Sequence, residues 1–247
     1  MGNCLKTQLK ENVQNNKLGT LGYCNILVIK DENVTGSLHL EIISKSEIII
    51  KSTGGPHLST TNGGAKVDTI TISGTSSQTR TTVYYDNDDY IIMISNKYDK
   101  PIRYIWLNGN VKYDISEIAL AAAEHPYSSI LNLKDSKVFG DIIWFKEYTR
   151  LEQLYISNTK VTGDIINFAK SRIISNLIAS DSLLYGSIES LANGLVANNK
   201  SSGTLSISCN NTRITYNNSY ISTCTLNFGT SMVNPTAEDT ARGWQIA

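Results

Sequence analysis

One motif recurs three times at a constant spacing of 23 residues, in the segments 131–142, 154–165 and 177–188. Each copy is too short to bury its own apolar side chains, so consecutive copies must stack and share one core. Such a stretch folds as a row of similar coils, in which equivalent residues lie one above another. The apolar positions shared by the three copies, with the residues that follow them, are Leu131/Leu154/Leu177, Leu133/Ile156/Ala179, Val138/Val161/Leu184, Ile142/Ile165/Ile188 and Phe145/Phe168/Leu191.

The repeated motif, L-x-[LIA]-x-[DN]-[ST]-x-[VL]-x-G-[DS]-I, resembles the leucine-rich repeat over residues 129–215. The resemblance implies that each coil has a strand, a polar ladder position that is usually Asn, and a turn that contains Gly. The chain keeps Asn158 at the ladder position but has Asp135 and Asp181 in the other copies, and an ionised Asp only accepts hydrogen bonds. We therefore expect an interrupted amide ladder. Segment 205–209 is expected to restart the strand after an insertion of five residues, with Cys209 at the ladder position.

A row of coils needs a shield at each end, because the terminal coils would otherwise expose the shared core. Upstream of the repeats, 105–109 has the pattern of a strand and 115–123 that of a short helix, which together predict a cap. Downstream, 220–228 predicts the other cap. The sequence thus predicts a solenoid with caps over residues 105–247.

Residues 21–104 have a different pattern, in which short runs of β-branched and aromatic residues alternate with turn-forming residues. This spacing predicts a β-sandwich-like domain, and the glycine-rich segment 52–66 predicts a long exposed loop. The expected fold is mainly β with some α: an N-terminal β-sandwich-like domain followed by a short leucine-rich-repeat-like solenoid. The predicted strands are 24–29, 36–43, 47–51, 67–73, 81–85 and 90–95.

The sequence contains no motif for catalysis or cofactor binding. Lys plus Arg equals Asp plus Glu at 22 each, so no overall positive charge attracts nucleic acid. No apolar run is long enough for a membrane-spanning helix. We therefore expect a protein that is not an enzyme, with no cofactor, no nucleic-acid partner and no membrane. A glycosidase stays open as an alternative, because its paired carboxylates leave no local motif.

An acidic tetrapeptide lies between two predicted strands, and two interpretations fit it. Clustered carboxylates bind Ca²⁺, whereas Asn and Asp also favour the tight turn of a hairpin. We favour the turn and predict no metal site, with calcium as the alternative. The four cysteines lack the close spacing of a zinc or redox site, which predicts free thiols. The residues of the tetrapeptide are Asp86, Asn87, Asp88 and Asp89.

The strand side of the coils exposes alternate residues, which form a candidate ligand face. Aromatic side chains dominate binding energies at protein surfaces, so Tyr155 is the expected anchor. Three or four coils give only a small, nearly flat sheet, so a spacer that binds nothing fits the pattern equally well. The residues of the candidate ligand face are Asn132, Lys134, Tyr155, Ser157, Ile178 and Ser180.

The opening of the chain, MGNCLKTQLK at 1–10 and NNKLGTLG at 15–22, resembles that of virion proteins of crAss-like bacteriophages. The resemblance implies a fibre on the phage head, or one associated with the tail, that is made in the host bacterial cytoplasm and located in the virion. Residues 1–20 are polar and lack periodicity, so they would form an arm that docks on a capsid or other virion protein. The docking residues would be Met1, Gly2, Asn3, Cys4, Leu5 and Leu9.

Fibres of this kind assemble as symmetric oligomers, so the resemblance also implies a homo-oligomer, either a dimer or a trimer. A head fibre would decorate the capsid and attach weakly to a glycan or protein of the host surface. Two alternatives stay open. One is a tail-fibre adhesin, and the other is a freestanding leucine-rich-repeat binding protein of a gut bacterium.

Overall fold

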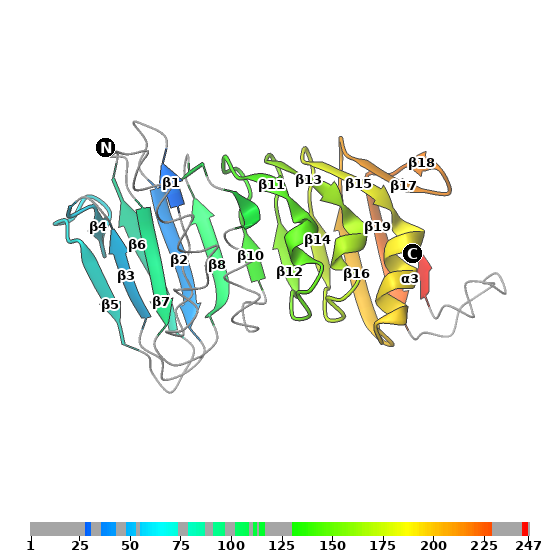
Figure 1. Ribbon diagram of the computed structural model, residues 1–247, viewed down its shortest axis with the longest axis horizontal. Coiled ribbons are helices and arrows are strands. Elements are labelled where there is room, and N and C mark those ends of the chain that lie inside the picture. The colour runs from blue at the N-terminus through cyan, green and yellow to red at the C-terminus, as the bar shows by residue number, and fades with distance from the viewer. Residues whose placement is uncertain are drawn as a thin grey trace.

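The described residues of the computed structural model form three β-sheets with short helices beside them (Figure 1). The protein is mainly β with some helix, as the sequence predicts. The described residues are 28–30, 36–42, 48–52, 55–73, 79–86, 91–96, 102–108, 111–112, 114–116, 130–228 and 244–246.

Nine strands of the described chain precede the repeats and pair with one another in antiparallel fashion. Five of them form a sheet in the order β5-β3-β7-β1-β9, and the other four, in the order β8-β2-β6-β4, form one part of a ten-stranded sheet. Residues such as Leu38, Ile48 and Ile50 are buried in one hydrophobic cluster. The bounds are β1 Val28–Lys30, β2 Gly36–Ile42, β3 Ile48–Ser52, β4 Leu58–Ser59, β5 Thr69–Ile72, β6 Thr79–Tyr85, β7 Ile91–Asn96, β8 Ile102–Asn108 and β9 Val111–Lys112.

The prediction of an exposed loop over 52–66 is wrong in its middle. Leu58 is fully buried, and its strand β4 pairs with β6. The backbone of Leu58 also exchanges hydrogen bonds of 2.8 and 2.7 Å with that of Val67. Because these bonds satisfy its peptide groups, Leu58 can enter the core despite the glycine-rich surroundings. The glycines supply the turn at 62–64 and do not make the whole segment exposed.

Equivalent strands of the repeated segments lie side by side. Strands β10, β12, β14 and β16 pair in parallel, and Leu131, Leu154, Leu177 and Ile207 lie opposite one another. All fifteen repeated apolar side chains are fully buried in one cluster. The bounds are β10 Ile130–Asn132, β11 Phe139–Asp141, η2 Ile142–Phe145, β12 Gln153–Tyr155, β13 Lys160–Asp164, η3 Ile165–Phe168, β14 Asn176–Ile178, β15 Leu183–Ser187, α3 Ile188–Ala197, β16 Gly203–Ser208, β17 Arg213–Tyr216, β18 Ser219–Tyr220, β19 Thr223–Phe228 and β20 Trp244–Ile246.

The predicted register of the fourth coil is wrong by two residues. Ile207, not Leu205, lies opposite Leu177, so this spacing is 30 residues, seven more than the 23-residue period (30 − 23 = 7). Cys209 therefore falls in the buried row of Ala179 and not at the ladder position, which Asn211 takes. The third coil contains the ten-residue helix α3 where the first two have four-residue 3-10 helices, and this difference accounts for the longer coil.

The ladder position forms pairs of side chains between neighbouring coils. Asp135, Asn158, Asp181 and Asn211 all have positive φ, between 56° and 60°, which Asn and Asp tolerate better than other side chains. Nδ2 of Asn158 donates to Oδ1 of Asp135 at 2.7 Å, and Asn211 donates in the same way to Asp181. Each carboxylate thus accepts from the amide of the next coil, so the acidic residues fit the ladder in alternation with Asn.

The glycine turns bring neighbouring coils closest together. Gly163 has φ of 124°, and a Cβ placed on it would lie 2.5 Å from Oδ1 of Asp141 in the preceding coil. Gly186 meets Asp164 in the same way. Each of these Asp side chains caps its own 3-10 helix: Asp141 accepts from the Ile143 N–H at 2.8 Å. The Asp that follows the motif Gly in each of the first two coils therefore caps the helix of its own coil. The Gly of the next coil, which lacks a side chain, leaves room for that Asp.

Strand β8 joins the two halves of the chain. It pairs in parallel with β10, where Ile105 lies opposite Leu131, and in antiparallel fashion with β2 on its other side. The ten-stranded sheet therefore continues, in the order β20-β19-β16-β14-β12-β10-β8-β2-β6-β4, through the predicted boundary at 104 and 105 (Figure 1). Part of the predicted upstream cap is thus an inner strand of this sheet. At the other end, β19 lies antiparallel to the last coil strand, where the sequence predicts the second cap.

Candidate functional site

The outer side of the ten-stranded sheet contains two rows of side chains that cross most of the sheet, which we call the sheet face. Residues such as Leu131 and Leu154 point into the core, so their neighbours in the strands point outward. By register, the first row is Thr82, His39, Trp106, Asn132, Tyr155, Ile178 and Ser208. The second row includes Arg80, Tyr104, Ile130, Gln153, Asn176 and Ser206.

An imidazole and an indole stack at one end of the first row. The rings of His39 and Trp106 have centroids 4.2 Å apart and an interplanar angle of 23°. The two imidazole nitrogens are held by hydroxyls, with Nδ1 2.9 Å from Oγ1 of Thr82 and Nε2 3.0 Å from Oγ of Ser37. Burial lowers the pKa of His39 below its usual value, which favours the neutral ring. These contacts fix the Trp106 side chain against the sheet.

Tyrosine and amide side chains occupy the middle of the sheet face. The Tyr155 hydroxyl donates to Oε1 of Gln153 at 2.7 Å, and this bond leaves the Gln153 amide N–H groups as donors. Burial, together with the nearby Tyr104 and Glu152, raises the pKa of Tyr155, so its phenol stays protonated. The Asn132 amide lies 3.5 Å from the Tyr104 hydroxyl, which is long for a hydrogen bond.

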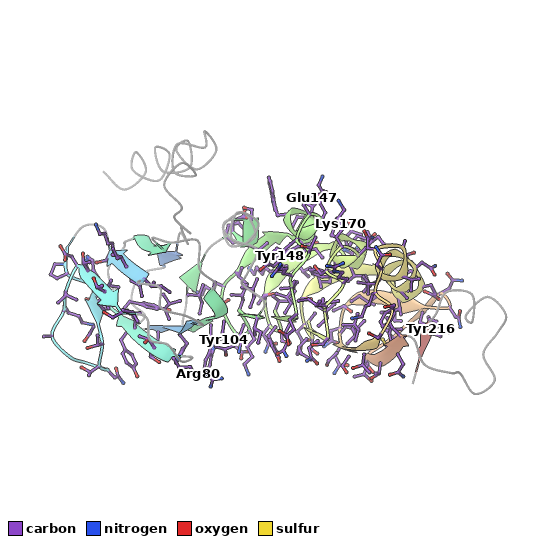
Figure 2. All side chains as sticks on the ribbon, turned by 90° about the horizontal axis from the view of Figure 1, so that it is seen from below. Arg80, Tyr104, Glu147, Tyr148, Lys170 and Tyr216 are labelled. Carbon is purple, nitrogen blue, oxygen red and sulfur yellow. The ribbon has the colours of Figure 1, made fainter. Side chains whose placement is uncertain are left out.

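A cation lies over the tyrosine of β8. The Arg80 guanidinium carbon is 5.9 Å from the centre of the Tyr104 ring, within the range of a cation–π interaction. Figure 2 shows both side chains on the side of the molecule opposite Glu147 and Lys170, which form an exposed ion pair of 2.6 Å. The sheet face and the side that bears the short helices are therefore separate surfaces.

The structure brings the predicted ligand-face residues together in two sets. Asn132, Tyr155 and Ile178 lie side by side in the first row. Lys134, Ser157 and Ser180 lie beyond the strand ends, and Oγ of Ser180 is 3.2 Å from Oγ of Ser208. The proposed docking residues of the arm, within residues 1–20, lie outside the described residues.

Sequence reasoning missed ten of the thirteen residues named on the sheet face, and the ones that matter most for recognition are His39, Tyr104, Trp106 and Gln153. Tyr104 and Trp106 alternate with the buried Ile105 and Leu107, and this period of two marks an outward strand face. Their place in the same two rows as Tyr155 and Gln153 depends on the pairing of β8 with β10, which no local pattern predicts.

The acidic tetrapeptide is described only at its first residue, Asp86. Oδ1 of Asp86 lies 3.0 Å from Nδ1 of the buried His57. Residues 87–89 lie outside the described residues, so the choice between a turn and a calcium site stays a prediction. In the part of the chain that the structure describes, no three His, Cys, Asp or Glu side chains lie close enough to hold a metal ion.

Two further kinds of polar group are buried near the last coil. Nζ of Lys200 donates to the carbonyl oxygens of Arg172 and Ile174 at 3.0 and 2.9 Å, and burial lowers its pKa. Cys209 and Cys224 are free thiols, as the sequence predicts for the two cysteines that the structure describes. Burial, with Cys209 nearby, raises the pKa of Cys224 to about 12, so this thiol stays protonated at neutral pH.

Comparisons with known proteins give a partial structural similarity. No protein-family model matches the chain, and no curated protein matches it. Among solved structures, it is similar to the leucine-rich-repeat ectodomain of the Arabidopsis receptor kinase HAESA, solved in complex with an N-terminally extended IDA peptide hormone. The similarity has 21% sequence identity and a TM-score of 0.30, and it covers 42% of this chain and 16% of that one. None of the described helices is long and apolar enough to cross a membrane.

Proposed function

We propose that the protein is a non-enzymatic structural protein of a phage particle, most simply a head fibre that docks through residues 1–20 and displays the sheet face outward. The resemblance of residues 1–22 to virion proteins of crAss-like phages is the observation that carries the particle assignment. The elongated arrangement of the described strands supports it, because a fibre protein has an extended body (Figure 1).

The finer fold is part of the same proposal. Residues 21–104 form a β-sandwich-like domain, and residues 105–247 form a leucine-rich-repeat-like solenoid with caps. The sheets that contain β3 and β2 share one hydrophobic cluster, which supports the first assignment. The parallel pairing of β10, β12 and β14, with one turn motif per coil, supports the second. The shared sheet through β8 joins the two parts end to end.

The outer surface supports a role in recognition. Tyr155, Trp106 and Tyr104 lie partly exposed on one face of a sheet whose other face is the core. Aromatic side chains supported by a rigid sheet are typical anchors of binding surfaces. A freestanding binding protein is the second candidate, because it would use the same sheet face without a docking arm.

Particle attachment can be tested by co-purification. Phage particles assembled with the full chain should retain it through density-gradient centrifugation, and deletion of residues 1–20 should abolish retention while the deleted protein stays folded by circular dichroism. A Tyr155→Ala variant should co-purify like the unchanged protein, because its change lies on the sheet face. A soluble monomer that never associates with particles would favour the freestanding binder.

A further inference from the structure

We propose that the sheet face binds an uncharged glycan, lying across the strands along the row of Trp106, Asn132 and Tyr155. This deepens the recognition role proposed above, and it does not depend on attachment to a particle. Three properties coincide in the part of the sheet face between β8 and β16: no formal charge, many hydrogen-bonding groups and fixed aromatic rings.

The charge pattern points to a neutral ligand. From β8 to β16 the two rows have ten positions, none of which is a charged residue. Eight of the ten have a hydroxyl, an amide or an indole N–H, and the other two are Ile130 and Ile178. A polyanion would need cations here, and an apolar partner would need a continuous aliphatic patch. A glycan needs neither, because its hydroxyls donate and accept as the amides of the sheet face do.

Amide groups are available for such a ligand. Gln153 uses its Oε1 to accept from Tyr155, so its N–H groups can donate outward. Oδ1 of Asn132 is buried and has no hydrogen-bond partner among the residues that the structure describes, so it can accept from a ligand only if the side chain turns outward. Asn176 adds a third amide, so the three lie on the adjacent strands β10, β12 and β14. They form a short cluster of donors and acceptors beside Tyr155.

The aromatic spacing suits an extended chain of sugars. Trp106 and Tyr155 lie in the same row two strands apart, which is about 10 Å at the usual distance between strands. That is roughly the length of two linked pyranose rings in an extended chain. His39 covers one face of the indole, so a sugar would meet its other face or its edge. Because His39 and the Gln153 bond already hold these rings, binding would cost little side-chain entropy.

The test uses the full chain and defined polysaccharides. In affinity gel electrophoresis, at least one of β-glucan, mannan, galactan, xylan and starch should retard the protein. Alginate and heparin should have no such effect, and added salt should not weaken the retardation, because no ion pairs are involved. Titration with oligosaccharides of the retarding polymer then gives the Kd.

Variants separate the sheet face from other exposed aromatic residues. Tyr155→Ala and Gln153→Ala should each weaken binding about tenfold or more, and Tyr155→Phe should weaken it less because the ring stays. Tyr220→Ala is the matched control, since this tyrosine is 72% exposed and lies outside the sheet face. All variants are compared at equal folded fraction by circular dichroism.

Three results would overturn the proposal. The first is that no neutral polysaccharide retards the protein. The second is that an anionic polymer, or an added protein such as gelatin, retards it more strongly than any neutral polysaccharide does. The third is that Tyr220→Ala loses as much binding as Tyr155→Ala. Each of them leaves the particle proposal intact, because co-purification depends on residues 1–20. Conversely, glycan binding by a protein that never joins a particle would support this inference and not the head-fibre role.

Discussion

Replacing Gly163 with alanine tests the close contact between neighbouring coils. The backbone at this position has φ of 124°, which L-residues rarely adopt. The new Cβ would lie 2.5 Å from Oδ1 of Asp141, 2.6 Å from Cγ1 of Ile142 and 3.1 Å from the Ile142 backbone nitrogen. The backbone cannot yield as a flexible side chain would, so the coil must shift or Asp141 must leave its place.

The expected cost has two parts. Backbone strain of a non-glycine residue at such a φ contributes about 1–3 kcal/mol. Displacing Asp141 removes its 2.8 Å hydrogen bond to the Ile143 N–H, and loss of a helix cap costs about 0.5–2 kcal/mol. Together they lower the free energy of unfolding by about 2–5 kcal/mol, a large part of the total for an ordinary domain. For a chain of this size the melting temperature should fall by about 5–20 °C.

The assay is thermal and urea unfolding, followed by circular dichroism. Gly203→Ala is the matched control, because Gly203 has φ of 83° but nothing lies within 4 Å of its virtual Cβ. The free energy of unfolding of Gly203→Ala should therefore fall only by the contribution from backbone strain. If Gly163→Ala is no less stable than Gly203→Ala, the close contact between coils does not contribute to stability and the reasoning fails.

Three other changes test the coils and the last strands. Leu154→Ala, in the fully buried row, should lower the free energy of unfolding by about 2–5 kcal/mol, whereas Ile173→Ala, at a side chain that is 46% exposed, should change it little in urea unfolding. Asn158→Ala should lower the free energy of unfolding by about 1 kcal/mol more than Asn158→Gly does. Both variants lose the hydrogen bond to Asp135, but only Ala is strained at φ of 56°. Equal losses of stability in urea unfolding would argue against this strain. The raised pKa of Cys224 means that the unfolded thiol ionises from about pH 9 while the folded one stays protonated to about pH 12, so stability should fall as pH rises through this range. The fall, measured by unfolding at several pH values, should be smaller in Cys224→Ala than in the unchanged protein.

The coils could be predicted because their pattern is local and repeated. Leu131, Leu154 and Leu177 recur at a fixed spacing, and each must be buried for the copies to be stable at all. The fourth coil could not be placed in the same way. Leu205 and Ile207 are both apolar and two residues apart, so the pattern fits either register, and the length of α3 settles which of them meets Leu177.

The candidate site was predictable in one half only. Tyr155 is an outward residue of a recognised repeat, so its exposure follows from the alternation of the strand. Trp106 and His39 belong to strands far away in the sequence, and their place in the same row depends on long-range pairing. The pairing of His57 with Asp86 is another contact of this kind, because 29 residues separate the two side chains.

The sequence by itself determined the buried rows and the turn positions of the three 23-residue repeats, because these follow from side-chain periodicity and from the few residue types that tolerate positive φ. Only the tertiary structure decided that β8 pairs with both β2 and β10, so that one sheet crosses the predicted boundary at 104 and 105. Hydrogen bonding between strands is made by backbone groups that nearly every residue has, so the sequence does not specify which strand edges meet. That choice depends on which arrangement buries the apolar faces of both halves in one core, and it placed Trp106 in the same row as Tyr155 on the sheet face.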